Sequence, residues 1–170
     1  DAITQAGRFT PISEINDIGS RPVLAAGLVF ASSQSGMTIA IDGRTGNRVW
    51  EQIIGSTQAP ALAGDALFVI GNDGRIAALN AGTGKAYWVK ELPQFEKVEK
   101  KKDRISYAGP ILASGRLIII SSTGRLIALS PQNGEEICSL KLGGKVFIEP
   151  IAAGGKLLVL TNDAKLIAIR

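Results

Sequence analysis

The stretch NDGRIAALNAGTGKAYW, residues 72–88, decides the fold of this chain because it recurs. An upstream copy, SGMTIAIDGRTGNRVW, covers residues 35–50, and a downstream copy, STGRLIALSPQNGEEIC, covers residues 122–138. A shorter copy, NDAKLIAIR, covers residues 162–170. Each copy follows an apolar segment that opens with a proline, at Pro22, Pro60, Pro110 and Pro150. Self-similarity with a period of about 40 residues indicates a repeat architecture.

The GTGK sequence that ends at Lys85 looks at first like a phosphate-binding loop, but its surroundings do not fit one. A P-loop needs Ser or Thr after the lysine and a glycine earlier in the loop, whereas this chain has Ala86 and Leu79 there. The residues after the glycines read as a strand, not as the helix that a dinucleotide-binding fingerprint opens. In the other copies Lys85 is replaced by Asn47 and Glu135, so no phosphate ligand is maintained. GTGK is therefore interpreted as a turn.

Each repeat reads as four short strands. In the second repeat we expect strands at residues 60–63, 66–70, 75–79 and 86–91, with turns at 72–74 and 80–84. Asn and Gly accept the positive φ that such turns need, and the glycines expected to do so before the last strand are Gly46, Gly84 and Gly134. Four strands in roughly forty residues are typical of a β-propeller blade. We therefore predict an all-β fold of four-stranded antiparallel blades.

The repeats divide the chain into a preceding tail and connecting loop at 1–20, then blades at 21–59, 60–109 and 110–149, and an incomplete three-stranded blade at 150–170. The second blade carries a charged insertion at 93–107. About four blades suggest half of an eight-bladed propeller, and the lack of an initiator Met suggests a processed or excised piece. Two alternatives stay open. Residues 2–9 could supply the missing strand, or two chains could pair as a pseudo-eight-bladed ring.

The last strands of three repeats align with one another, and Trp50, Trp88 and Cys138 occupy equivalent positions in them. We expect these residues to pack between neighbouring blades, with Cys138 as a small core residue, because free cysteine behaves as a buried hydrophobe. The alternative for Trp50 and Trp88 is stacking on a quinone cofactor. The insertion contains the run FEKVEKKKDR at 95–104, which is either a solvated loop or a partner-binding loop.

The composition argues against several classes of function. The chain has no histidine, the commonest general base, and its acidic residues fall mostly at turns, so we expect no enzyme. A metal site of His and Cys is excluded, whereas a calcium site of Asp, Asn and backbone oxygens stays open. The net charge of +4 is spread over all repeats without an aromatic-basic stripe, so nucleic acid is not an expected partner. No apolar run reaches membrane-spanning length.

The units AIDGRTGNRVWEQ (40–52) and ALNAGTGKAYWVK (78–90) resemble the PQQ-type propeller repeat, A-x-D-x-x-T-G-x-x-x-W. The order of the repeats over the whole chain resembles the C-terminal half of the BamB family of outer-membrane assembly lipoproteins. This resemblance implies a non-enzymatic, cofactor-free, eight-bladed scaffold in the periplasm of a Gram-negative bacterium. It implies binding to the POTRA domains of BamA, with unfolded outer-membrane proteins as a further partner and with the lipid anchor outside this chain.

The loop NDIG at 16–19 looks like the family's Asp-hydrophobic-Asp loop. The resemblance therefore implies that Asp17 and Ile18 contact the partner, although Gly19 replaces the second acid. The alternative functions are a fragment of a PQQ-dependent dehydrogenase, which binds its quinone with calcium, and a ligand-sensing propeller.

Overall fold

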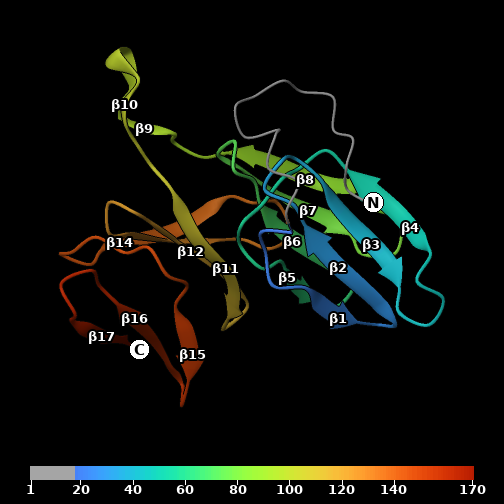
Figure 1. The fold of residues 1–170 in the computed structure, drawn as a ribbon. Helices are drawn as coiled ribbons and strands as arrows, with labels where there is room; N and C mark the ends of the chain where they lie inside the picture. Colours follow the sequence, from blue (N-terminus) through green and yellow to red (C-terminus); the bar gives the residue numbers. More distant parts are fainter. Residues whose placement is uncertain (1–17) are drawn as a thin grey trace. The chain divides into compact units, whose positions relative to one another are not determined.

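The computed structural model describes residues 18–170, which divide into two compact units that meet at Lys90 and Glu91. The first unit contains two antiparallel sheets (Figure 1). One sheet has the order β1 (Val23–Ala25), β2 (Leu28–Ser32), β3 (Thr38–Asp42), β4 (Arg48–Gln52). The other has the order β5 (Ala61–Ala63), β6 (Ala66–Ile70), β7 (Arg75–Asn80), β8 (Ala86–Glu91), which begins in this unit and ends one residue into the next.

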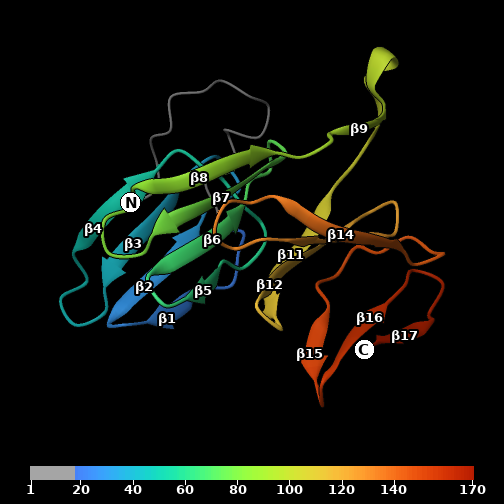
Figure 2. The ribbon, with the colours of Figure 1, turned by 180° about the vertical axis from the view of Figure 1, so that it is seen from behind.

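The second unit continues the same pattern (Figure 2). One sheet has the order β11 (Tyr107–Ala113), β12 (Arg116–Ser121), β13 (Arg125–Leu129), β14 (Glu136–Lys141). The last sheet has three strands, β15 (Ile151–Ala153), β16 (Lys156–Leu160) and β17 (Leu166–Ile169). The prediction of an all-β chain built from four-stranded antiparallel sheets is confirmed. Residues 18–170 contain no helix that is long and apolar enough to cross a membrane.

The middle strands form the core of each sheet. β6 and β7 are buried along almost their whole length, and so are β12 and β13. Their sequences, such as LIII and LIAL, are continuous apolar runs, as expected of strands that are covered on both faces. The last strands of the sheets, by contrast, expose most of their residues. In the second unit, one apolar cluster joins Ile120 and Leu126 of one sheet to Leu157 and Val159 of the next.

The turn before the last strand of each sheet is built by its own side chains. The Asp42 carboxylate accepts hydrogen bonds from the Thr45 backbone N–H at 2.7 Å and from its hydroxyl at 2.8 Å. These bonds hold the pKa of Asp42 below its usual value. The Asn80 amide oxygen accepts the same pair of bonds from Thr83, both at 2.9 Å. This geometry explains why the repeat sequence has Asp or Asn three residues before Thr.

A glycine closes each of these turns. Gly46, Gly84 and Gly134 have φ values of 74°, 72° and 72°. Side chains with a Cβ rarely adopt this left-handed conformation, whereas glycine adopts it freely. The turn role expected for these glycines from the sequence agrees with their backbone geometry.

Trp50 joins the two sheets of the first unit. It lies on β4, is 8% exposed, and its indole Nε1–H donates to the Ala81 carbonyl of the next sheet at 2.7 Å. Its ring centroid lies 6.0 Å from that of Phe30, and it shares one apolar cluster with Leu67 and Leu79. A Cβ added at Gly84 would lie 2.7 Å from the indole Cδ2. The turn of the next sheet therefore needs glycine to approach the indole.

Trp88 repeats within its own sheet the contact that Trp50 makes with Phe30. It is half-buried on β8, and its ring lies 6.1 Å from that of Phe68 in its own sheet.

The expectation that Cys138 is a core residue is wrong, because its side chain is exposed. Its register is as expected, since Cys138 pairs with Ala128 as Trp50 pairs with Ala40. Trp50 is buried because the turn after β7 covers it. Cys138 lies on β14, whose residues are all exposed, and its sulfur accepts from the Arg116 guanidinium at 3.9 Å.

The charged insertion is a hairpin and not an irregular loop (Figure 1). It consists of β9 (Phe95–Lys97), a single 3₁₀ turn η1 (Val98–Lys100) and β10 (Lys102–Arg104). At its base the Ile105 N–H donates to the Gln94 carbonyl at 2.8 Å, and the Tyr107 hydroxyl donates to the Pro93 carbonyl at 2.8 Å. Burial raises the pKa of Tyr107 to about 12.

Replacing Trp50 tests its role between the sheets. Trp50→Ala should lower the free energy of unfolding by about 3–5 kcal/mol, because the change leaves a cavity. Trp50→Phe should lower it less, by about 1–3 kcal/mol, because it mainly leaves the Ala81 carbonyl without its donor. Urea unfolding followed by circular dichroism measures both values. Equal stability of Trp50→Phe and the parent chain would contradict a contribution from the indole hydrogen bond.

Gly84 and Gly46 form a matched pair for testing the contact with Trp50. Both have positive φ, so an added Cβ costs each about 1–2 kcal/mol in backbone strain. Nothing lies within 4 Å of a Cβ added at Gly46, whereas at Gly84 it meets the indole. Gly84→Ala should therefore destabilise the chain clearly more than Gly46→Ala in the same unfolding assay. Similar losses for the two variants would mean that the indole gives way at no cost.

The exposure of Cys138 predicts fast reaction of its thiol with a disulfide reagent in the native protein. The rate should lie within about tenfold of the rate for the urea-unfolded chain, because no folded structure shields the sulfur. Absorbance of the released thiolate measures both rates. A native rate that is slower by several orders of magnitude would show that Cys138 is covered in solution.

Candidate partner-binding face

The predicted contact residues Asp17 and Ile18 precede the first sheet. The candidate site is therefore the end of each sheet where such linkers lie. In an antiparallel meander, alternate turns lie at opposite ends of the sheet. The turn between the second and third strands therefore shares one end with the linker that leads to the next sheet. We call this side the linker face. It comprises residues 18–22, 33–37, 53–60 and 71–74 in the first unit, and 122–124, 142–150 and 161–165 in the second.

Backbone hydrogen bonds tie the turns of this face to the linkers. In the first unit the Ser56 N–H donates to the Ser33 carbonyl at 3.0 Å, and the Asn72 N–H donates to the Gly55 carbonyl at 2.8 Å. The Asn72 side-chain amide also donates to the Gln34 carbonyl at 3.2 Å. The linker 53–60 is thus held by the turns of both sheets that it joins.

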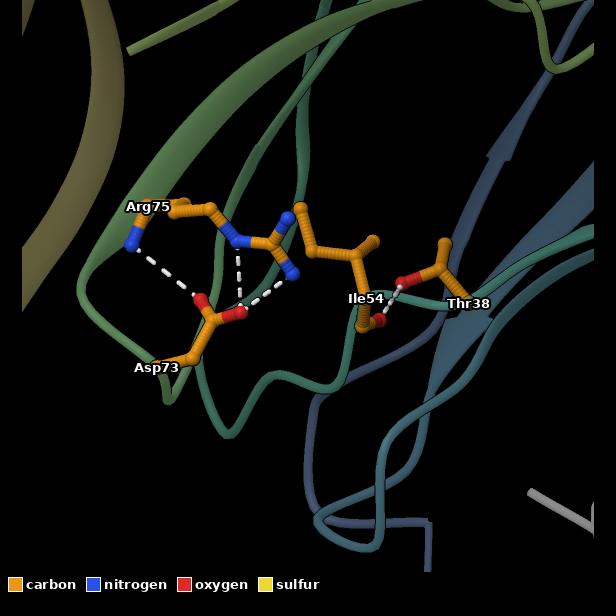
Figure 3. A network of polar contacts seen from close by, with 4 residues as sticks. All are labelled: Thr38, Ile54, Asp73 and Arg75. Atoms are coloured by element: carbon orange, nitrogen blue, oxygen red, sulfur yellow. Dashed lines mark hydrogen bonds and ion pairs between the residues drawn. The ribbon is translucent and has the colours of Figure 1, made fainter. Parts of the chain in front are cut away.

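Buried hydroxyl groups form hydrogen bonds beneath the linker face of the first unit. The Ser32 and Thr38 hydroxyls lie 2.8 Å apart, and the Thr38 hydroxyl donates to the Ile54 carbonyl at 2.6 Å (Figure 3). Ser20 contacts Ser32 through its hydroxyl, which accepts from the Ser32 N–H at 3.1 Å. Ser20, Ser32 and Thr38 are each at most 5% exposed. Within the described residues every buried side-chain N or O atom has a hydrogen-bond partner, so no group of this polar layer is left unsatisfied.

An ion pair fixes the turn between β6 and β7. The Asp73 carboxylate accepts from the Arg75 backbone N–H at 3.1 Å and from the guanidinium Nε–H at 2.6 Å, and it also pairs with Nη2 (Figure 3). Such a two-point contact holds the guanidinium in one plane. Both side chains are more than a third exposed, so the pair orders the turn but adds little stability.

The structure describes one of the two predicted contact residues. Asp17 lies outside the described residues. Ile18 is described, is 54% exposed and forms an isolated antiparallel bridge with Ser33. Its side chain is therefore presented to solvent from a backbone that is paired with the adjacent turn.

The second unit has an apolar hollow on its linker face that sequence reasoning did not single out. The hollow has a volume of about 270 Å³ and is lined by Phe147, Ile148, Leu160, Thr161, Asn162 and Ala164. Phe147 is 53% exposed and Ile148 is 54% exposed, although both are large apolar residues. Val146 beside them is 1% exposed and anchors the linker in the core. The Asn162 N–H donates to the Lys145 carbonyl at 2.8 Å, which repeats the bond between Asn72 and Gly55.

A signal for this hollow is present in the sequence. The segment VFIEP ends at Pro150, just as the predicted contact loop and its continuation, NDIGSRP, end at Pro22. In both linkers apolar residues stand within four positions of the proline, where a turn-forming linker usually carries polar residues. Aligning the linkers by their prolines would therefore have indicated Phe147 and Ile148.

The chemistry that this face offers is the binding of apolar side chains. Among residues 18–170, no three His, Cys, Asp or Glu side chains gather closely enough to hold a metal ion. The indole of Trp50, which the sequence offered as a residue that could stack on a quinone, is buried against the next sheet. The exposed groups Ile18, Phe147 and Ile148 stand instead on hydrogen-bonded linkers.

Comparisons with known proteins agree with this fold. The solved structure of BamB from Moraxella catarrhalis superposes with a TM-score of 0.76 at 19% identity, covering 89% of this chain and 44% of that one. The outer membrane protein assembly factor BamB of Escherichia coli is 28% identical over 145 residues. The quinoprotein alcohol dehydrogenase PedH of Pseudomonas putida is 27% identical over 135 residues, covering 68% of this chain and 22% of the dehydrogenase.

The match to the Escherichia coli protein covers 85% of this chain but 35% of the relative, so the chain spans about a third of that protein's length. A sequence profile of a family described as outer membrane protein assembly factor BamB matches residues 1–90 and again 72–170, which together cover the whole chain. The chain therefore belongs to the family of the outer membrane protein assembly factor BamB.

Proposed function

We propose that this chain is a non-enzymatic scaffold in outer-membrane protein assembly, and that the linker faces of its two units bind folded periplasmic domains, the POTRA domains of BamA. The family supports a role in assembly, because the relatives with the matching repeats are assembly factors. The same relationship supports a periplasmic location at the outer membrane. The protein's contribution is binding and orientation and not covalent chemistry.

The observation that carries this proposal is the exposure of Ile18, Phe147 and Ile148 on the two linker faces. Each of them leaves about half of a large apolar side chain in water. Removing such a side chain from water stabilises a complex, at about 25 cal/mol for each Å² that is buried. Because hydrogen bonds already order the linkers, binding needs little further loss of backbone entropy. A preorganised apolar surface of this kind suits a folded protein partner.

Unfolded outer-membrane proteins are a second partner that we propose for the same scaffold. β14 ends its sheet, so one of its edges has no partner strand among the described residues. Ile137 and Leu140 on β14 are also exposed apolar residues. Such edges accept an extended segment by strand addition.

A quinoprotein dehydrogenase is the alternative that the similarity to PedH favours. Its cofactor would be a quinone, and the tryptophans of the repeats are the residues that could stack on it. The burial of Trp50 between sheets and the contact of Trp88 with Phe68 favour packing roles instead. A titration with the quinone and calcium separates the two functions, because only a dehydrogenase gains a cofactor absorbance band and oxidises alcohols.

The direct test is binding of the chain to purified POTRA domains by biolayer interferometry. Asp17→Lys, Ile18→Asp and the double variant Phe147→Asp/Ile148→Asp should each weaken binding by about tenfold or more, as expected for contact residues at the centre of an interface. Ile137→Asp serves as the matched control, since Ile137 is 50% exposed but lies on the outer strand β14. This control should bind like the parent chain.

Two outcomes would contradict the proposal. Absence of saturable binding by the parent chain would place the partner site outside these residues. Equal losses for the linker-face variants and for Ile137→Asp would show a general effect of added charge and not a specific face. Circular dichroism of each variant checks that the fold is retained.

A further inference from the structure

The hairpin of β9, η1 and β10 carries half of the net charge of the chain. Residues 95–104 contain five basic and three acidic side chains, a net charge of +2, whereas the whole chain has +4. Its described side chains from Glu96 to Arg104 are all exposed. This hairpin forms a two-stranded sheet of its own in the segment that leads to β11, and the Ser106 carbonyl at the end of that segment accepts from the Ser122 N–H of the linker face at 2.8 Å.

The hairpin is an ordered projection within the second unit. β9 and β10 pair with Lys102 opposite Lys97 and Arg104 opposite Phe95. The bonds from Ile105 to Gln94 and from Tyr107 to Pro93 close its base, and Tyr107 itself is 8% exposed. Both views show the hairpin extending beyond the start of β11, away from the other strands of this unit (Figures 1 and 2). A buried anchor thus holds an exposed arm.

The charges of the arm are not balanced within it. Lys97 and Lys102 are directly opposite each other, and like charges in such a cross-strand pair destabilise a hairpin. Asp103 offsets part of this repulsion through an ion pair with Lys97 at 3.0 Å. No ion pair within residues 18–170 involves Lys100, Lys101 or Lys102. These three consecutive lysines, which we call the lysine tip, present positive charge without a counter-charge from the described residues.

The amino-acid composition of the lysine tip indicates which kind of anion it would bind. Lysine is a compact charge on a flexible stem, whereas recognition of a particular carboxylate or phosphate usually uses the planar fork of arginine. The tip also lacks the Trp, Tyr and Arg anchors that dominate protein interfaces. Clustered lysines without such anchors suit a diffuse anionic surface. We infer that the lysine tip binds the anionic phosphate headgroups of a membrane surface and so holds this scaffold against the bilayer.

The expected strength follows from membrane electrostatics. Each lysine near an anionic bilayer contributes roughly 1 kcal/mol, so losing three of them should reduce partition onto vesicles by about a hundredfold. The attraction acts over a Debye length, about 10 Å at 0.1 M salt, and should therefore disappear in concentrated salt.

The test is co-flotation of the full 170-residue chain with vesicles of phosphatidylcholine alone, or of phosphatidylcholine mixed with phosphatidylglycerol. The chain should float only with the anionic vesicles and at low salt. The triple variant Lys100→Gln/Lys101→Gln/Lys102→Gln should lose this binding, and the corresponding triple arginine variant should keep it. The matched control removes three exposed lysines elsewhere, Lys85, Lys141 and Lys156, by substitution with glutamine.

The control variant should retain most of the binding, because it removes the same net charge from other places. Equal loss in the control and in the tip variant would overturn the inference in favour of non-specific attraction by total charge. Failure of the parent chain to float with anionic vesicles would overturn it as well, and a tip variant that then bound POTRA domains more weakly would assign the lysines to an acidic protein surface. The vesicle test contains no protein partner, so its result is independent of the proposed scaffold function.

Discussion

The hydrogen bond from the Trp50 indole to the Ala81 carbonyl is the constraint on which the first unit depends. A single sheet of this kind buries its middle strands only if another sheet covers it. Trp50 provides that cover from the outer strand of one sheet, and the glycine turn of the next sheet lets the indole approach. The repeat motif is explained by this contact, since Asp or Asn, Thr and Gly build the turn and Trp fills the space beneath the turn of the following sheet. One motif therefore specifies both the strand order within a sheet and the packing between sheets.

The linker face depends on the same packing but uses different chemistry. Its turns and linkers cannot bury long apolar runs, because their backbone groups need hydrogen-bond partners. The small hydroxyl residues Ser20, Ser32 and Thr38 meet this need at almost complete burial. Ile54 and Val146 of the linkers are also buried, whereas Ile18, Phe147 and Ile148 remain exposed on backbone that is already ordered. Exposed apolar groups on rigid linkers are what a binding surface requires and what a purely structural linker would avoid.

The repeat gave most of the fold in advance, because strand length, turn chemistry and register are local properties. The strands at 66–70 and 86–91 were predicted with the bounds that the structure has. Burial depends on the neighbouring sheet and is not local, which is why Cys138 shares the register of Trp50 and is nevertheless exposed. The insertion was predicted as a loop because its charge hides the alternation of a hairpin, whose pairing rests on only three residues in each strand. Of the candidate site, sequence resemblance indicated Ile18 but not Phe147 and Ile148, since their exposure follows from the anchoring of Val146.

The chain therefore carries two surfaces of different chemistry. The linker face offers apolar groups whose attraction is short-ranged and independent of salt, whereas the lysine tip offers charge that acts over several ångströms and weakens with salt. An apolar contact discriminates between partners by shape, and a diffuse cationic contact does not. A scaffold that needs one chosen partner and a general location at a membrane requires both kinds of contact. Within the second unit, the buried anchor at Tyr107 carries the lysines on a hairpin of their own, so their charges and the apolar groups of Phe147 and Ile148 belong to separate segments of the chain.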